Sequence, residues 1–275
     1  MDRNSSKMDE VNLLPFLTPI TIFISAIIIF VGLIVISTKV DKLSGGNLNL
    51  TANSQNTTTT AETKTISNEQ IDALFERNDL IFMGSKDAKL KIVEISDPSC
   101  PYCHIAGGYN PELASQDARF KYDTDGGTYV PPVREIEKLV NEGKAQFVWL
   151  YFPGHGAGEV ATQVMYCAYD QGKFFEAHNA LFTNIAYSVI NNEVKNDIAL
   201  VDKLYALLPT NVVNDSLKEC VSSGKYKARL ASEQTLSYTF AVGPNFGTPG
   251  FFVNYQNFAG AYSWTEMKSA ADAAL

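Results

Sequence analysis

Two cysteines, Cys100 and Cys103, stand one helical turn apart in the run SCPYCH, residues 99–104. A cysteine at the start of a helix meets free backbone N–H groups and the positive end of the helix dipole, which stabilise a thiolate. Cys100 is therefore the candidate nucleophile, and Cys103 the candidate resolving cysteine of a thiol–disulfide exchange site. Pro101 suits the first helical turn because it has no N–H to leave unpaired. Pro101, Tyr102 and His104 are expected to tune the stability of the thiolate.

Three other interpretations of this pair stay open. The run CPYCH matches the short c-type haem attachment pattern, although the chain has only three histidines. A zinc site would need further ligands, and the remaining cysteines, Cys167 and Cys220, lie far away in segments predicted to be helical. A purely structural bridge between Cys100 and Cys103 would close a very small loop and restrain little chain. Redox chemistry is the favoured interpretation, and no metal is expected.

The N-terminal part of the chain predicts a membrane tether. Residues 1–12 form a short tail, and residues 13–37 contain an uncharged apolar run long enough to span a bilayer once. A weak small-residue pattern at its end leaves cleavage as an alternative. Residues 38–69 are polar and threonine-rich, which is typical of a disordered linker. Because lysines and arginines flank the span almost evenly, charge alone does not fix its orientation.

The rest of the chain, residues 70–275, predicts one folded domain with the cysteine pair at a strand-to-helix junction. Apolar runs at 89–96, 146–152 and 251–254 are expected to be strands. Between the last two runs, apolar residues recur with helical spacing. The chain therefore indicates an α/β domain with an all-helical insertion at about 156–238. Ser263, three residues before Glu266, is typical of a capping box that opens a terminal helix.

Three segments in this order resemble the DsbA-like thioredoxin-fold family. They are VEISDPSCPYCH around the cysteine pair, MYCAYDQGKFFEAHNALF in the helical part, and GTPGFFVN near the C-terminus. The resemblance covers about residues 78–275. It implies a thioredoxin fold with an inserted all-helical subdomain, preceded here by one transmembrane helix and a disordered linker.

The resemblance also implies roles for individual residues. Pro249 would be a cis-proline facing Cys100, and the backbone of Thr248 would pair with an extended substrate segment. From the sequence alone, an ordinary trans turn proline is the alternative for Pro249. Glu94 would be a buried acid that exchanges protons with Cys103, whereas strict strand alternation would turn it to solvent.

A second disulfide, Cys167–Cys220, is implied by the resemblance, and two buried free thiols are the alternative. One segment departs from the family. Residues 107–130, which contain Gly107-Gly108 and Pro111, are expected to be an insertion beside the active site. It either shapes substrate access or is a surface excursion. His155 and His178 are expected to pack or cap rather than to catalyse.

The expected function is a dithiol oxidase that introduces disulfides into exported proteins and needs no cofactor. Its partners would be unfolded or partly folded exported proteins with cysteines, and a quinone-linked membrane protein that reoxidises the pair. The net charge of -8 argues against nucleic acid as a partner. Because reducing systems in the cytoplasm oppose disulfide formation, the domain is expected on the extracytoplasmic side of the membrane. A reductase or isomerase with the same cysteines, and a non-catalytic peptide-binding module, stay open.

Overall fold

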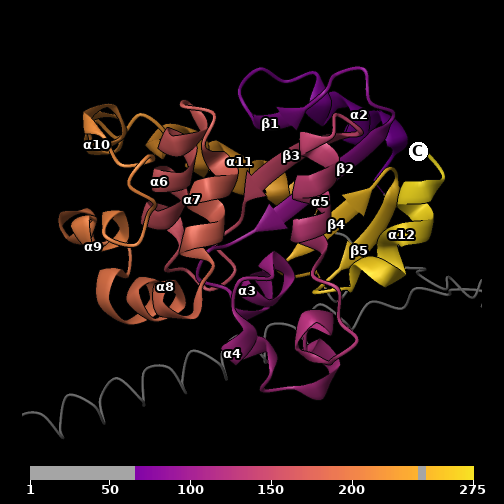
Figure 1. The fold of residues 1–275 in the computed structure, drawn as a ribbon. Coiled ribbons are helices and arrows are strands. Elements are labelled where there is room, and N and C mark those ends of the chain that lie inside the picture. Colours follow the sequence, from indigo (N-terminus) through magenta and orange to yellow (C-terminus); the bar gives the residue numbers. More distant parts are fainter. Residues whose placement is uncertain (1–65, 241–245) are drawn as a thin grey trace, which may run out of the picture. The chain divides into compact units, whose positions relative to one another are not determined.

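The computed structural model describes residues 66–240 and 246–275, and within them five strands form one mixed sheet (Figure 1). The strands are β1 (Ile81–Gly84), β2 (Leu90–Ser96), β3 (Ala145–Tyr151), β4 (Gly250–Val253) and β5 (Gln256–Ala259). Their order across the sheet is β1-β3-β2-β4-β5. Strands β2 and β3 pair in parallel, and the other neighbours pair antiparallel. Strand β2, which leads to the cysteine pair, is therefore the central strand.

The described domain begins slightly earlier than the sequence predicted. Helix α2 (Asn68–Phe75) starts two residues before the expected boundary at residue 70. The reason is a capping box, because Ser67 and Gln70 each satisfy a backbone N–H of the other. The expected tail, membrane span and linker up to residue 65 lie outside the described residues. Within residues 66–240 and 246–275, no helix is both long and apolar enough to cross a membrane.

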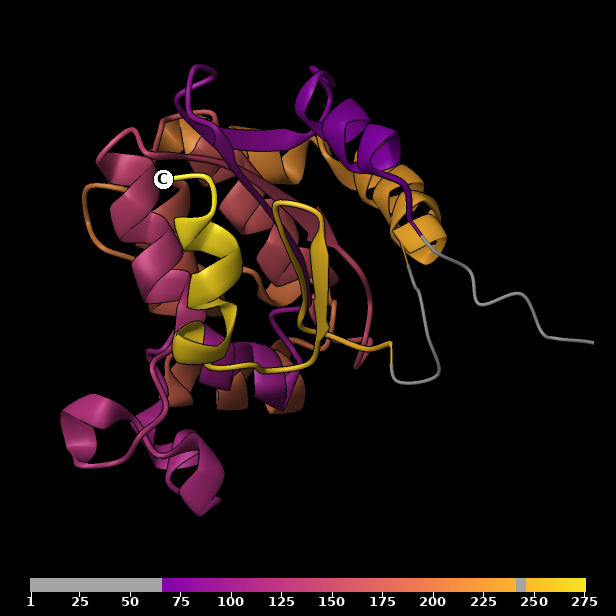
Figure 2. The ribbon, with the colours of Figure 1, turned by 90° about the vertical axis from the view of Figure 1, so that its right-hand side faces the viewer.

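Helices cover both faces of the sheet (Figure 2). On one face, α2 and α11 (Lys227–Phe240) lie side by side over an apolar cluster that includes Val93 and Ile95 of β2. On the other face, α5 (Pro132–Asn141) and α12 (Trp264–Asp272) join the larger core, which includes Ile92. Because β2 is buried on both faces, its apolar run is nearly continuous.

The helical block begins at α6, as the periodicity predicted. Its helices are α6 (Glu159–Tyr169), α7 (Phe174–Leu181), α8 (Asn184–Ser188), α9 (Asp202–Tyr205) and α10 (Asp215–Ser222), with a π-helical turn at Val189–Val194. The last helix of the block, α11, departs from the expectation of a separate all-helical insertion. Its Glu233 accepts hydrogen bonds from the Tyr151 N–H of β3 and from the Tyr166 hydroxyl. Helix α11 is therefore part of the cover of the sheet.

A disulfide joins Cys167 of α6 to Cys220 of α10 across 53 residues of sequence. This confirms the pairing that the family resemblance implied, and the alternative of two free thiols is wrong. The bridge also removes the two further cysteines that a zinc site at Cys100 and Cys103 would have needed. Because it joins α6 to α10, the bridge is a covalent cross-link within the helical block.

Removing this bridge should lower stability strongly. In the chain-entropy description, a loop of this length contributes roughly 4 kcal/mol to the free energy of unfolding. We expect the double variant C167S/C220S to lose about that amount in urea unfolding followed by circular dichroism. The matched control is C100S/C103S, which removes a pair that closes only a small loop and should change the free energy much less. Equal losses in the two variants would contradict this account.

Candidate active site

The sulfur of Cys100 lies where β2, α3 (Pro101–Gly107) and the segment before β4 meet. Cys100 is the residue that precedes the first turn of α3, and Pro101 occupies that first turn as predicted. The Cys100 thiol donates a hydrogen bond to the Thr248 carbonyl oxygen at 3.1 Å. Cys100 and Cys103 are both free thiols and both buried. The structure thus brings together residues that are 148 positions apart in the sequence.

The two thiols have opposite electrostatic surroundings. Hydrogen bonding from the Cys103 thiol is the largest influence that lowers the pKa of Cys100, and the Thr248 side chain and the Cys103 backbone N–H add to it. Burial is the largest influence that raises the pKa of Cys103, and its hydrogen bond to Cys100 adds to it. Cys100 is therefore the better nucleophile and the better leaving group, while Cys103 holds its proton.

The peptide bond between Thr248 and Pro249 is cis. Pro249 directly precedes β4, which pairs antiparallel with β2. The Pro249 carbonyl oxygen accepts a hydrogen bond from the Gly260 N–H at 2.8 Å, which ties this segment to the end of β5. The Thr248–Pro249 segment is thus fixed from both sides beside Cys100. Its pairing with a substrate backbone stays a prediction.

Glu94 is fully buried in β2, so the alternative of a solvent-facing side chain is wrong. The prediction from the alternation of side chains along the strand was wrong because β2 is a central strand with no solvent-facing side. Within the described part of the chain, neither carboxylate oxygen makes a hydrogen bond of ordinary geometry. Burial raises the pKa of Glu94 to about 8, partly offset by the nearby Ser96 hydroxyl. Glu94 therefore carries a proton at neutral pH, as a group that exchanges protons with Cys103 requires.

Tyr102 and His104 have different environments despite their shared helix. The Tyr102 side chain is about half exposed, and its ring packs edge-on against Phe120 at 5.7 Å. His104 is fully buried, and its Nε2 donates to the Pro98 carbonyl oxygen at 2.8 Å. Burial lowers the pKa of His104 to about 4, so the ring is neutral at physiological pH. His104 therefore supports the loop before Cys100 and is not placed as a haem ligand.

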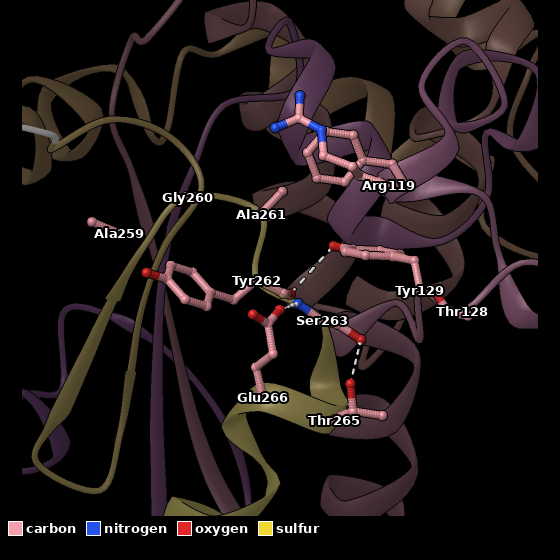
Figure 3. Close-up of a pocket in the computed structure, with 11 residues that line it drawn as sticks. Arg119, Thr128, Tyr129, Ala259, Gly260, Ala261, Tyr262, Ser263, Thr265 and Glu266 are labelled. Atoms are coloured by element: carbon pink, nitrogen blue, oxygen red, sulfur yellow. Dashed lines mark hydrogen bonds between the residues drawn. The ribbon is translucent and has the colours of Figure 1, made fainter.

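Residues 107–130 form a folded excursion packed against α3. The segment contains the short helix α4 (Pro111–Ala114). The Tyr122 hydroxyl donates to the Ile105 carbonyl oxygen of α3 at 3.1 Å. On the other side, the Tyr129 hydroxyl donates to the Tyr262 carbonyl oxygen at 3.3 Å (Figure 3). The excursion and the turn that links β5 to α12 together line an open pocket of about 580 Å³.

Asp97 is an organising residue of the site whose role was not predicted from the sequence. Its carboxylate is fully buried. One oxygen accepts hydrogen bonds from the N–H and the hydroxyl of Ser99 at 2.8 and 2.7 Å, and the other accepts from the His155 N–H at 2.8 Å. Asp97 therefore joins the loop before Cys100 to the loop after β3. The Asp97-Pro98 sequence gave no sign of this contact, because its partner lies 58 residues away.

His178 is buried and stacked on Phe182, as its predicted packing role requires.

Glu94 should make stability depend on pH. Because its pKa is raised to about 8 from the ordinary value of 4.5, the folded protein keeps a proton that the unfolded chain loses. The stability that this proton gives is present at low pH and is lost as the pH rises to 8. In E94Q the amide cannot ionise. We therefore expect the free energy of unfolding of E94Q, relative to wild type, to rise by about 3 kcal/mol between pH 5 and pH 8.

Urea unfolding of both proteins at the two pH values, in the same redox state, measures this difference. Taking the difference between variant and wild type cancels the contributions of the other titrating groups. A difference that stays constant from pH 5 to pH 8 would show that Glu94 does not hold its proton in the folded protein.

Comparisons with known proteins agree with this geometry. A family model described as Thioredoxin matches residues 133–273, which is more than half of the chain. The solved structure of alpha-DsbA1 from Wolbachia pipientis superposes with a TM-score of 0.54 at 19% identity, and the match covers 76% of this chain and 96% of that chain. This likeness concerns the fold.

Curated relatives are longer than the part that matches. A Na(+)/H(+) antiporter, NhaA 3, of Salinispora tropica is 24% identical over 195 residues, which are 70% of this chain but only 24% of the antiporter. A Rickettsia prowazekii protein named as a protein-disulfide oxidoreductase is 26% identical over 200 residues, which are 72% of this chain and 62% of that protein. With the family match, the sheet order and the cysteine pair beside a cis-proline, the chain belongs to the DsbA-like thioredoxin-fold family.

Proposed function

We propose that this chain is a protein thiol–disulfide oxidoreductase that works as a dithiol oxidase. The observation that carries the proposal is the pair of opposite pKa shifts at Cys100 and Cys103. A stabilised Cys100 thiolate favours the reduced enzyme, and an enzyme that favours its own reduced form is a strong oxidant of its substrates. These shifts, with Cys100 at the start of α3, support this direction.

The reaction consists of two thiol–disulfide exchanges. A substrate thiolate attacks the Cys100 sulfur of the Cys100–Cys103 disulfide, a bond to the substrate forms, and Cys103 leaves as a thiolate. A second substrate thiolate then attacks the substrate sulfur of this mixed disulfide, and Cys100 leaves. The substrate loses two electrons and two protons, and the enzyme gains both. The lowered pKa of Cys100 assists the second exchange, because Cys100 is then the leaving group.

Glu94 is the proposed proton donor for this cycle. When Cys103 leaves as a thiolate it is buried, and a buried charge is costly without a proton or a partner. Glu94 is protonated up to about pH 8, and it lies on the same face of β2 as Ile92, which belongs to the same apolar core as Cys103. After burial and the larger influences of Tyr122 and Glu266, Cys103 and Glu94 also raise the pKa of Tyr129, so both groups lie within electrostatic range of Tyr129. Transfer of the Glu94 proton would return Cys103 to its neutral form.

The proposed setting is the extracytoplasmic side of a membrane. The apolar run at 13–37 supports a single-pass anchor, and residues 38–65 would serve as its tether. Unfolded or partly folded exported proteins with cysteine pairs are the proposed substrates, bound along Thr248 and Pro249 by backbone pairing. A quinone-linked membrane protein is the proposed oxidant that restores the Cys100–Cys103 disulfide.

Cysteine variants test the roles of the two sulfurs. The oxidised wild-type domain should oxidise a reduced, unfolded protein that has two cysteines, and the loss of substrate thiols measures the rate. In C103S, Cys100 should attack a small-molecule disulfide and stop after this first exchange. The mixed disulfide at Cys100 should accumulate and be visible by mass spectrometry. C100S should form no such adduct, because the remaining Cys103 is fully buried with a raised pKa.

The same experiment separates the competing functions. A peptide-binding module would bind unfolded protein equally well in wild type and C100S, and the wild type would not oxidise substrate thiols. A reductase would leave the reduced substrate unchanged; in the reverse assay its reduced Cys100–Cys103 pair would convert a substrate disulfide into two thiols and itself become the enzyme disulfide. Adduct formation at Cys103 in C100S, at a rate similar to that at Cys100 in C103S, would contradict the assignment of the nucleophile.

A further inference from the structure

The loop that follows β3, residues 153–158, lies against the segment that precedes Cys100. Its His155 N–H donates to the buried Asp97 carboxylate at 2.8 Å, and its Ala157 N–H donates to the Ser99 hydroxyl at 3.2 Å. Asp97 and Ser99 are in turn bonded to each other. Two backbone groups of the loop are thus fixed to residues that stand one and three positions before Cys100.

Glycines allow this loop to come close to the active site. A Cβ atom on Gly154 would lie only 2.2 Å from the Thr248 hydroxyl oxygen, and one on Gly158 would lie 2.0 Å from an Asp97 carboxylate oxygen. Gly156 has a φ of +81°, a conformation that favours glycine. His155 is the residue between Gly154, which touches Thr248, and Gly156. Thr248 itself accepts the hydrogen bond of the Cys100 thiol.

The helical block holds the loop from its other side. The Asn196 side chain donates to the Gly156 carbonyl oxygen at 2.7 Å, and its oxygen accepts from the Glu159 N–H at 2.8 Å. From the π-helical turn, the Asn191 side chain donates to the Ser99 carbonyl oxygen at 3.2 Å. The loop therefore contacts the segment before Cys100, Thr248 and the helical block. The His155 side chain is on the part of the loop that faces solvent.

We propose that this clamped loop positions the His155 imidazole beside the Cys100 sulfur, where its positive charge stabilises the thiolate. In this chain the residues between the two cysteines are proline and tyrosine, neither of which carries a positive charge. His155 supplies that charge from another segment of the fold. Its charge is among the influences that lower the pKa of Cys100, after the hydrogen bonds from Cys103 and Thr248.

His155 would thus be a residue that acts through Cys100 and does not itself touch the substrate. The inference rests on the proposed role of Cys100 as the nucleophile, and it holds for either direction of the redox reaction. The other ionisable groups on the segments around the loop and Cys100 include Asp97, Tyr102, Cys103, His104, Tyr151, Glu159 and Tyr187.

The test is a titration of the Cys100 thiolate by its ultraviolet absorbance in the reduced protein. H155Q should raise the pKa of Cys100 by roughly 0.5–1, which is a three- to tenfold smaller ionisation constant. H155K, which keeps a positive charge at any pH in the titration, should restore a low pKa. K268Q is the matched control, because it removes one exposed positive charge on the last helix and should leave the titration unchanged.

Salt separates an electrostatic effect from a packing effect. Because His155 is exposed, the difference between wild type and H155Q should shrink as the ionic strength rises from about 0.01 M to 1 M. An identical titration of wild type and H155Q would overturn the proposal. So would an H155K protein that titrates like H155Q, since the effect would then come from the shape of the imidazole. The proposed oxidase function has its own test, because these titrations need no substrate.

Discussion

The contact between the Cys100 sulfur and the Thr248 carbonyl oxygen is the constraint on which the rest of the site depends. It places the Cys100 sulfur, in the segment that follows β2, 3.1 Å from the Thr248 carbonyl oxygen, in the segment that precedes β4. The antiparallel pairing of β2 with β4 brings these two segments together, and the peptide bond from Thr248 to Pro249 at this point is cis. The sheet therefore acts as the frame of the site, and the redox pair follows the C-terminal end of its central strand.

Around this contact, three segments of different origin shape the chemistry. Helix α3 begins directly after Cys100 and contains Cys103. In the excursion at 107–130, the ring of Phe120 packs against the ring of Tyr102. The loop at 153–158 is fixed to Asp97 and is held in turn by the helical block. The helical block thus supports the site directly, through side chains that reach the residues before Cys100. This gives the block a role beyond covering the sheet.

The sequence predicted the parts of the fold that depend on local patterns. The strands predicted at 89–96, 146–152 and 251–254 differ from β2, β3 and β4 by no more than one residue at either end, because each is a dense apolar run with turn residues beside it. Strands β1 and β5 were not predicted, since each has four residues and lies at an edge of the sheet. The cysteine pair was found from its spacing, and the Cys167–Cys220 bridge only from the family resemblance.

Residues that depend on long-range contacts were harder to predict. The burial of Glu94 was ambiguous because the alternation of apolar and polar residues predicts burial only for a strand with one solvent-facing side. Strand β2 has no such side. Asp97 and His155 form their contact across 58 residues, so neither had a local signal for its role. His155 was expected to pack or cap, but its side chain is exposed, and the contact that fixes it is made by its backbone N–H to Asp97. The one sequence signal that could have drawn attention to His155 is the glycine on each side of it.

The central claim is that the fold stabilises the reduced, thiolate form of Cys100 and so makes the Cys100–Cys103 disulfide an oxidant. The most direct test is the equilibrium constant of this pair against glutathione, measured on the domain by alkylation and mass spectrometry. The account predicts a reduction potential of about −200 mV or higher, above that of reducing thioredoxins at roughly −270 mV. A potential at or below the thioredoxin value would contradict it.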